Sequence, residues 1–504
     1  MIALLALRNV AYRPWRSAML FTGFGLGVAV MIVLLSVGEA MLTQARDEQL
    51  IGGGQVTVLP EGMDIELMKT GGVGGLWFSI NNARFVYGQL LASPRLAADI
   101  AAVAPQVVRK TVWLTSAGRE WPVLATGEIP GATRAVGGAP ALAAGVWEDN
   151  DADRRYVRPT LAELHHDIDH FHLPPADRAS GERDSWGEWH YFNVLSDDGA
   201  RWAFLSFMVS GDVSGGRWTG QQLITLHESG KPARRFSMTV PASQVTFSTT
   251  SADLRTGRGS VTVREDGDYV VRGLARGEGA DAGRTATVSL VVHPVAHAWF
   301  PGAQLGGGSA SGGLVSGYAV PGLRATASGE ICVDGRCESF RDAQSYHDHN
   351  WGLWRRVQWE WGASRAGAYT FLYGRVQQTD RTAARAPIFF YLIDSLGFRA
   401  LFRPQRVVYE DGRSIVVDGR AVRVPSRAVM TDARGADTLR VEIDVDDAVA
   451  TDTRRGFVQR GDAGDAARIT EPYFIQMKGR ARLSGIVGGE RLAGTGRGFF
   501  ETYR

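Results

Sequence analysis

From Trp186 onward the chain consists of short runs rich in β-branched and aromatic residues, separated by turns, and this pattern constrains the fold most. The stretch "WGEWHYFNVLSDDGARWAFLSFMVSG" holds two such runs around an Asp-Asp-Gly turn, which indicates a β-hairpin. More runs follow at spacings of about 8 to 12 residues, the interval typical of sandwiches and barrels. A second series extends from Trp359 to the C-terminus. The pattern predicts a mainly β protein with two consecutive antiparallel barrels.

Length and charge narrow the class of protein. A chain of 504 residues is long enough for several domains. It carries 55 Lys and Arg against 53 Asp and Glu, a formal net charge of +2, and has no dense basic run. Because nucleic-acid binding needs a basic surface, nucleic acid is excluded as an expected partner.

One segment near the N-terminus is apolar enough to cross a membrane. Residues 18–37, "AMLFTGFGLGVAVMIVLLSV", contain no charge and reach the length of about 20 residues that a spanning helix needs. Arg8, Arg13 and Arg16 precede it, so the positive-inside rule places the N-terminus in the cytoplasm. A cleaved signal peptide is the alternative, but the run exceeds an ordinary signal-peptide core. We expect a single-pass protein of a bacterial inner membrane, with its bulk in the periplasm.

Changes in composition divide the chain into six parts. The "SPRLAADIAAVAP" segment, residues 93–105, has the start signal and apolar spacing of an amphipathic helix, so the part around it is read as a small α/β domain. The predicted parts are a basic lead-in (1–17), a transmembrane helix (18–38), this periplasmic domain (39–155), a linker or flap (156–184), a first barrel (185–354) and a second barrel (355–504).

The two cysteines lie close together in "CVDGRC". Cys332 and Cys337 flank an Asp-Gly pair, which favours a tight turn between paired strands. The two side chains can then face each other across a hairpin. A disulfide bond, which suits an oxidising compartment, and a pair of reduced thiols both fit the sequence.

The first predicted hairpin mixes polar groups with aromatic ones. With a period of two, one face of its first strand carries Trp186, Glu188, His190 and Phe192, and the other carries Trp189, Tyr191 and Leu195. A barrel that holds a ligand needs an apolar lining with a few placed polar groups. The alternative is that Glu188 and His190 face water at a strand edge.

The stretch "SYHDHNWG", residues 345–352, concentrates groups with chemical potential, and a metal site is its first interpretation. His347 and His349 share one face of a strand and could bind zinc with a further ligand. The other histidine cluster, "HHDIDHFH", offers His165, His166, Asp167, Asp169, His170 and His172. Neither stretch has the spacing of a known zinc motif, so we predict no metal and no other cofactor.

A structural clasp and a catalytic acid are the other two interpretations of this stretch. In a clasp, Asp348 binds backbone N–H groups or a histidine, while Trp351 and Trp354 close one end of a barrel. As an acid, Asp348 is held among His347 and His349 near those tryptophans. Apolar surroundings raise a carboxyl pKa, whereas a protonated histidine lowers it, so both interpretations stay open.

The first 60 residues resemble the start of MacB/FtsX-type ABC transporter permeases. The resemblance rests on "ALRNVAYRPWRSAMLFTGFGLGVAVMIVLLSVGEAMLTQ" followed by "GGGQVTVLP", and it weakens through about residue 155, where "VLATGEIPG" still fits. Such permeases have further membrane helices after the periplasmic domain, and no later stretch here is long and apolar enough. The resemblance therefore implies a permease-like front end used as an anchor, beside ABC transporter subunits as possible partners.

Residues 180–504 resemble the carotenoid 1,2-hydratase (hydroxyneurosporene synthase) family and its AttH-like relatives. The resemblance rests on "GEWHYFNVLSDDGARWAFLSFMVSGD" and on "YHDHNWG" followed by "WEWG". It implies two lipocalin-like barrels in tandem and a cleft for a long apolar molecule between or within the barrels. In hydratase members an acidic residue protonates an isoprenoid double bond, which makes Asp348 the candidate acid. Tyr346 and Trp351 would then form an aromatic wall, and His347 or His349 would order the water.

Three functions follow from these features. The first is a membrane-anchored periplasmic protein that binds an apolar lipid or isoprenoid ligand beside an ABC transporter. The second is a carotenoid 1,2-hydratase-like hydro-lyase, and the third is a structural subunit of a transporter. The candidate catalytic residues are Asp348, His347 and His349. The candidate ligand-binding residues are Tyr346, Asn350, Trp351, Trp354, Trp186, Glu188, His190 and Tyr191.

Overall fold

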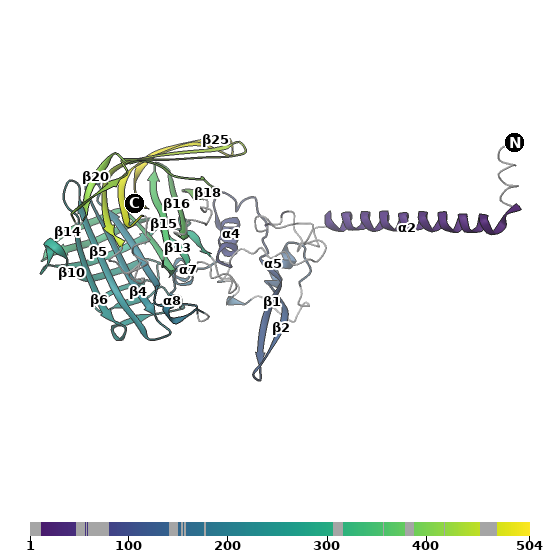
Figure 1. Cartoon of the computed structure of the whole chain (residues 1–504), viewed down its shortest axis with the longest axis horizontal. Helices are drawn as coiled ribbons and strands as arrows, with labels where there is room; N and C mark the ends of the chain where they lie inside the picture. The colour runs from purple at the N-terminus through teal and green to yellow at the C-terminus, as the bar shows by residue number, and fades with distance from the viewer. Residues whose placement is uncertain are drawn as a thin grey trace. The chain divides into compact units, whose positions relative to one another are not determined.

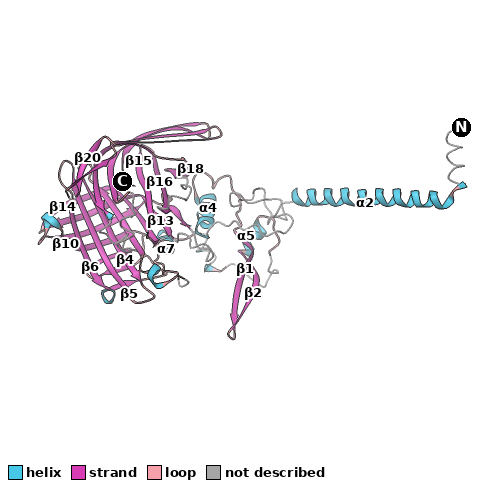
Figure 2. Ribbon diagram, viewed as in Figure 1, coloured by secondary structure: helices cyan, strands magenta, loops and turns pink. Residues whose placement is uncertain are grey.

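The structure is a computed structural model in which strands dominate (Figure 2). It describes residues 12–46, 56, 58, 80–140, 150–152, 155, 158–175, 178–305, 316–355, 357–378, 388–417, 419–453 and 471–504. The chain divides into two compact units. One comprises residues 1–78 and 102–153, and the other comprises residues 79–101 and 154–504.

The first unit contains a long apolar helix and a hairpin. Its elements are α2 (Pro14–Arg46), β1 (Gln106–Ser116), β2 (Arg119–Glu128) and α5 (Pro130–Ala135). Among the described residues, one helical segment, Pro14–Val37, is long enough and apolar enough to cross a membrane. Its length and composition suit a membrane anchor and a signal sequence alike.

The second unit begins with a helix that the sequence placed elsewhere. Helix α4 spans Ile80–Ala92, and residues 94–99 form turns, so the helix predicted over residues 93–105 is wrong. Ser93 and Arg95, in the expected first turn, are used in long-range contacts instead. The Ser93 hydroxyl donates to the Leu396 carbonyl at 2.7 Å, and Arg95 pairs with Asp394. These contacts fix the segment against a distant strand pair.

The first large sheet closes into a barrel (Figure 1). Its closed ring runs β11-β13-β14-β3-β4-β5-β6-β10 and is completed by pairing of β10 with β11. The ring strands are β3 (Trp186–Leu195), β4 (Arg201–Asp212), β5 (Arg217–Glu228), β6 (Arg234–Pro241), β10 (Tyr269–Gly277), β11 (Thr285–Pro294), β13 (Ser316–Val333) and β14 (Arg336–Leu353). Shorter strands at its margin are β7 (Val245–Phe247), β8 (Leu254–Thr256), β9 (Gly259–Val263) and β12 (Phe300–Leu305).

The second large sheet is antiparallel and has nine strands in the order β18-β17-β16-β15-β25-β24-β23-β22-β19. They are β15 (Val357–Ala366), β16 (Tyr369–Gln378), β17 (Phe389–Asp394), β18 (Gly397–Phe402), β19 (Val408–Glu410), β22 (Arg427–Arg434), β23 (Asp437–Asp452), β24 (Tyr473–Val487) and β25 (Glu490–Tyr503). A separate hairpin consists of β20 (Arg413–Val417) and β21 (Arg420–Val424). The predicted fold class, a mainly β chain with two large curled antiparallel sheets after one apolar helix, is confirmed.

Strand β3 belongs to the wall between the two sheets. All ten of its residues are buried, because one face lines the first barrel and the other packs on the second sheet. Phe192 and Val194 lie in the barrel core, whereas Trp189, Tyr191 and Leu195 lie in the cluster between the sheets. The Gln344–Leu353 part of β14 pairs with the whole of β3 and is mostly buried on both faces. We call β3 and β14 the shared wall.

A short helix brings polar groups to one end of the barrel. Helix α7 (Leu161–Ile168) begins at Thr160, which forms a capping box with Glu163. Leu164 and Ile168 pack in the cluster between the sheets. The chain after the helix then turns inward, so that Phe171 enters the barrel core. Helix α8 (Ser180–Arg183) follows before β3.

Candidate functional site

The residues of "YHDHNWG" separate onto the two faces of β14. His347 stacks on Phe192 in the barrel interior, with ring centroids 4.0 Å apart. Tyr346 faces the second sheet, where its ring lies 4.6 Å from that of Phe499. Asp348 accepts a hydrogen bond from Tyr346 and lies on that same outer face. The expected grouping of Asp348 with His347 and His349 is therefore wrong, because successive side chains of a strand point to opposite faces.

Inside the barrel, His347 and His349 meet a carboxylate from the end of α7. Asp169 Oδ2 lies 3.0 Å from His347 Nε2 and accepts a bond from the Tyr269 hydroxyl at 2.8 Å. Its other oxygen, Oδ1, lies 2.8 Å from His349 Nδ1. The opposite nitrogen of His349, Nε2, lies 2.9 Å from Glu188 Oε1. All these groups are buried, so they form a closed polar network within an apolar core.

The geometry fixes the charge of His349. Both of its ring nitrogens face carboxylate oxygens, so both must carry a proton. Burial opposes a charged ring, but the hydrogen bonds to Asp169 and Glu188 outweigh it and raise the pKa of His349 to about 10. Burial would likewise raise the pKa of Asp169, yet the rings of His190 and His347 hold that pKa well below its ordinary range. The network is thus a structural clasp held by charge-assisted hydrogen bonds.

Two sets of these side chains could hold a divalent metal. One set is Asp169, His190 and His347, and the other is His172, Glu188 and His349; within each, the donor atoms lie within 4.8 Å of one another. His347 donates its other ring N–H to the Tyr191 carbonyl, the arrangement that orients metal-binding histidines. Hydrogen bonds to Asp169 and Glu188 also explain why His347 and His349 lie so close to these carboxyl groups.

The remaining histidines of "HHDIDHFH" have separate roles. Nδ1 of His165 lies 2.8 Å from the Gly267 carbonyl, and His166 accepts a bond from the Ala252 N–H. Asp167 pairs with Arg84, and His170 bonds the carbonyl of Asp167. Of this stretch only Asp169 and His172 join the network around His349.

The predicted tryptophans lie at the end of the barrel and between the sheets. Trp351 stacks on His172 with ring centroids 3.9 Å apart and packs with Trp186 in a small buried cluster. Trp354 donates from Nε1 to the Gly187 carbonyl at 2.8 Å and packs on Trp189. The expected ligand-binding residues Trp186, Glu188, His190 and Trp351 are therefore parts of the barrel interior and its end.

On the outer face of the shared wall, Asp348 is held by two neighbours, one of which is bound by a third residue. The Tyr346 hydroxyl donates to Oδ2 at 2.7 Å, and Asn350 Nδ2 donates to Oδ1 at 2.7 Å. Trp361, from β15, donates to the Tyr346 hydroxyl at 2.8 Å. Asp348 is only 3% exposed. Burial, which outweighs these hydrogen bonds, raises its pKa well above the ordinary value, and the nearby Glu501 charge adds to the shift. Asp348 is thus a neutral carboxylic acid among aromatic rings.

A second buried carboxyl group faces the same space from β25. Trp359 donates from Nε1 to Glu501 Oε2 at 2.9 Å, and Gln476 donates to Oε1 at 3.2 Å. Burial raises the pKa of Glu501 to about 7. Sequence reasoning missed this residue, although "GFFETYR" places one carboxylate among aromatic residues near the C-terminal end of a predicted strand.

Three strands build this space in layers. The Cα register pairs Gln344 with Leu195, Tyr346 with Asn193, and Asp348 with Tyr191 along the shared wall. On β25, the alternate residues Arg497, Phe499 and Glu501 lie on the side of the strand that faces the shared wall. Gln344 bonds the Arg497 carbonyl, and Tyr346 contacts Phe499. We name the outer layer (Gln344, Leu195, Arg497), the middle layer (Tyr346, Asn193, Phe499) and the inner layer (Asp348, Tyr191, Glu501).

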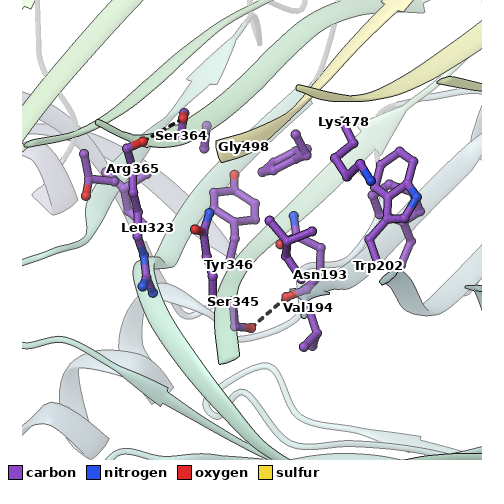
Figure 3. Close-up of a pocket in the computed structure, with 16 residues that line it drawn as sticks. Asn193, Val194, Trp202, Leu323, Ser345, Tyr346, Ser364, Arg365, Lys478 and Gly498 are labelled. Carbon is purple, nitrogen blue, oxygen red and sulfur yellow. Dashed lines mark hydrogen bonds between the residues drawn. The ribbon is translucent and has the colours of Figure 1, made fainter. Parts of the chain in front are cut away.

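A small cavity lies at the middle layer, between the sheets (Figure 3). Its volume is about 20 Å³, enough for one water molecule. A solvent-open groove of about 440 Å³ adjoins it, and both are lined by Leu195, Gln344 and Arg365. The groove thus leads to the cavity, and Tyr346, which lines the cavity, donates to Asp348.

The interiors of the two sheets are filled by side chains. Phe192, Phe207 and Phe236 occupy the core of the first barrel, and Phe371 and Phe390 occupy that of the second sheet. The large apolar cavity expected inside a barrel is not among the described pockets, because these rings take the space. The space open to a ligand lies between the sheets instead.

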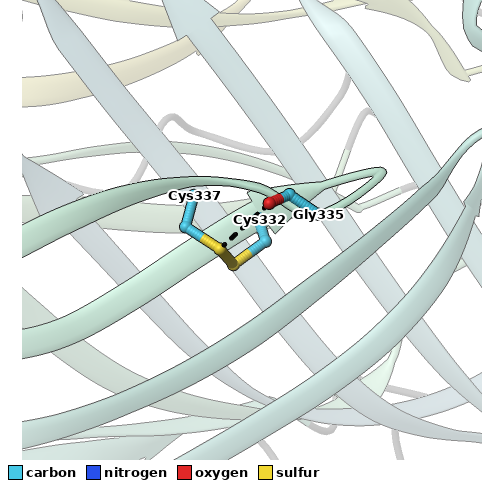
Figure 4. The surroundings of a disulfide bond; sticks show 3 residues. All are labelled: Cys332, Gly335 and Cys337. Carbon is cyan, nitrogen blue, oxygen red and sulfur yellow. Dashed lines mark hydrogen bonds between the residues drawn. A yellow bond between two sulfur atoms is a disulfide. The ribbon is translucent and has the colours of Figure 1, made fainter.

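Cys332 and Cys337 form a disulfide bond across the β13–β14 hairpin (Figure 4). The turn between them uses Asp334 and Gly335, whose φ angles of 49° and 78° are both in the left-handed region. That is the backbone of a type I′ hairpin turn, for which Asp-Gly is suited. The bond lies at the far end of β14 from Trp351, outside the layers described above.

Comparison with known proteins gives structural neighbours at low similarity. No protein-family model matches the chain, and no curated protein matches it. A structure described as AttH from Nitrosomonas europaea is 15% identical, with a TM-score of 0.42, and covers 66% of this chain and 98% of its own. CghA with Sch210972 is 14% identical, with a TM-score of 0.41, and covers 67% and 97%. Kievitone hydratase from Nectria haematococca is 10% identical, with a TM-score of 0.39, and covers 66% and 97%.

Proposed function

We propose that this chain binds an unsaturated apolar ligand between its two sheets and transfers a proton to it from Asp348, as a hydro-lyase that adds water to a double bond. The observation that carries this proposal is the Asp348 carboxyl group, buried on the outer face of the shared wall and bonded to Tyr346. A neutral carboxylic acid in apolar surroundings is the group that protonation of an alkene requires.

The surroundings of Asp348 suit the charge that such a step creates. Proton transfer to one alkene carbon leaves a carbocation on the next, and aromatic faces stabilise a cation. Tyr346, Trp361 and Phe499 supply those faces from two sheets. The cavity at the middle layer has room for the water that captures the cation. His347 and His349 belong to the clasp on the opposite face, so they support the wall and do not touch the ligand.

The groove beside the outer layer provides the entry. Its volume of about 440 Å³ falls within the range of small-molecule sites, whereas the cavity itself holds one water. A ligand therefore reaches Asp348 by parting Tyr346 from Phe499, which separates the two sheets locally. Arg365, Arg480 and Arg497 line the mouth together with Asp197 and Asp342, so the mouth itself is polar.

The N-terminal helix agrees with an apolar ligand. We infer that α2 anchors the chain in a bacterial inner membrane, with the sheets on the periplasmic side, which keeps the protein next to a membrane that dissolves such ligands. Association with ABC transporter subunits stays a prediction from the sequence.

The test uses the full-length protein in detergent with two probes, squalene and an acyclic carotenoid. We expect products heavier by one water, detected by mass spectrometry, and we expect Asp348→Asn to abolish them while the melting temperature and probe binding stay near those of the parent. Asp444→Asn, at a surface site 57% exposed, is the matched control. Probe binding without any added water would reject the hydro-lyase and leave a ligand-binding protein. Full activity of Asp348→Asn would reject this residue as the acid.

A further inference from the structure

The inner layer contains a second carboxyl group whose position the proton donor alone does not explain. Asp348 comes from the shared wall and Glu501 from β25 of the opposite sheet. Trp361 links them, because it donates to the Tyr346 hydroxyl, which binds Asp348, and its Cα is the register partner of Glu501. Two carboxyl groups on opposite walls of one space are the arrangement that acid–base chemistry uses.

Tyr191 shows that both carboxyl groups belong to one layer. It is the register partner of Asp348 on β3, and its ring lies 5.9 Å from that of Phe499 on β25. Burial first, and then the charges of Glu501 and Asp348, raise the pKa of its phenol well above the ordinary value. Tyr191 therefore stays a neutral hydroxyl that lies beside Asp348 in register and against Phe499 of β25.

The two carboxyl groups are held by different partners on opposite sides of the inner layer. Asp348 is bound by a phenol and an amide whose strand is the first barrel's own, and it is 3% exposed. Glu501 is bound by an indole and an amide, Trp359 and Gln476, and both of them donate. Each carboxyl group thus accepts two hydrogen bonds, and the two groups approach the inner layer from opposite sheets.

We propose that Glu501 is the general base that takes a proton from the attacking water, opposite the acid Asp348. This inference rests on the proposed function. Asp348 gives its proton to one alkene carbon, so that a C–H bond forms from the π electrons. The water oxygen then bonds to the neighbouring cationic carbon, and one O–H bond breaks as Glu501 accepts the proton.

The product is a tertiary alcohol, and the sum is alkene plus water. After the reaction Asp348 is ionised and Glu501 is protonated. Transfer of one proton from Glu501 to Asp348, through solvent or the Tyr191 hydroxyl, restores the starting state. The reverse sequence eliminates water, so the same pair serves both directions.

The test separates proton donation from water addition by running the reaction in heavy water. With the full-length parent protein and squalene as probe, we expect the product to carry one carbon-bound deuterium and one added hydroxyl. With Glu501→Gln, we expect water addition to fall at least about 100-fold while recovered squalene still gains deuterium, because Asp348 still protonates it reversibly. Glu490→Gln, on the same strand and 74% exposed, is the matched control.

Each other outcome has a defined meaning. Unchanged water addition by Glu501→Gln overturns the inference and leaves Asp348 as the acid. Loss of deuterium and water addition together in this variant, with a parent-like melting temperature, also overturns it, since Glu501 would then be needed for protonation. If the parent protein itself adds neither deuterium nor water, the proposed function fails and the inference with it. Glu501→Asp keeps a carboxyl group and is expected to retain measurable water addition, which separates lost chemistry from lost folding.

Discussion

His347 and Asp348 are neighbours in the sequence, yet their side chains lie on opposite faces of β14. The histidine bonds Asp169 inside the first barrel, and the aspartate bonds Tyr346 between the sheets. One strand therefore carries a structural network on one side and a chemical group on the other.

Removal of the clasp should destabilise the fold. In His349→Gln one side chain can no longer donate to Asp169 and Glu188 together, which leaves buried carboxylate charge without its cation. We expect a loss of about 3 kcal/mol in unfolding free energy, measured by denaturant titration in detergent. His293→Gln, whose side chain is 40% exposed, is the control and should lose much less. Equal losses in both variants would contradict the clasp.

The stability that His349 contributes should decrease as pH rises. The pKa of His349 is raised to about 10, so its stabilisation is fully present below the ordinary histidine value and is lost as pH rises through about 10. The stability difference between the parent and His349→Gln should therefore narrow in alkaline solution. A difference that widened with pH would show that the ring is neutral in the fold.

Glu501 should weaken the fold at neutral and alkaline pH. Its pKa is raised from 4.5 to about 7, so the unfolded chain ionises first and stability falls as pH rises between these values. Glu501→Gln should then be more stable than the parent by up to about 3 kcal/mol above pH 7, and equal to it below pH 4.5. Melting curves at both extremes decide, with Glu490→Gln as the control.

The rate of water addition should depend on pH through the ionisation of Glu501. The titratable groups that face Glu501 are Asp348 from β14, Tyr191 from β3 and Tyr503 from its own strand, and both tyrosines stay neutral because burial raises their pKa values. Activity should therefore rise as pH passes about 7, and this limb should disappear in Glu501→Gln. A limb that persists in the variant belongs to another group.

Tyr346→Phe should reduce activity more than stability. The change removes the donor to Asp348 and leaves the Trp361 N–H without its acceptor. We expect a loss of about 1 to 3 kcal/mol in stability and a fall in water addition of at least about tenfold. Tyr369→Phe, partly buried against the core of the second sheet, is the comparison for a lost phenol away from the site. Parent-like activity would exclude Tyr346 as a positioning residue.

The disulfide bond gives a test of location. Cys332 and Cys337 are paired in the structure, and such bonds persist outside the reducing cytosol. When cells are lysed with an alkylating reagent, both cysteines should escape labelling until a reductant is added. Mass spectrometry of the peptide that contains both cysteines provides the measurement. Complete labelling without reductant would contradict export of the sheets to the periplasm.

Local patterns in the sequence were enough to predict the strands. Alternating runs and Asp-Gly turns act between near neighbours, so the mainly β class and the curled sheets followed from them. The period of two in "YHDHNWG" also held the signal that Asp348 and its flanking histidines face apart. The helix expected at residues 93–105 failed because Ser93 and Arg95 bind residues some 300 positions away.

The partners across the sheets could not be read from the sequence. Asp169 meets His347 from 178 positions away, and Trp359 meets Glu501 from 142 positions away. No local pattern encodes which sheet packs on which, so Glu501 had no visible link to Asp348. The expected cavity inside a barrel failed for the same reason, since Phe192 and Phe207 turn inward only once the barrel closes.

Because the shared wall carries both the histidine network and Asp348, the effects of substitutions in it on activity are easily misinterpreted. Substitutions in β3 or β14 that loosen the histidine network would shift the backbone that holds Asp348, and activity would fall although no reacting group had changed. A mutational survey that measured turnover alone would thus assign structural residues of the wall to the reaction. A melting temperature measured beside every kinetic value would distinguish residues that support the wall from residues that take part in the reaction.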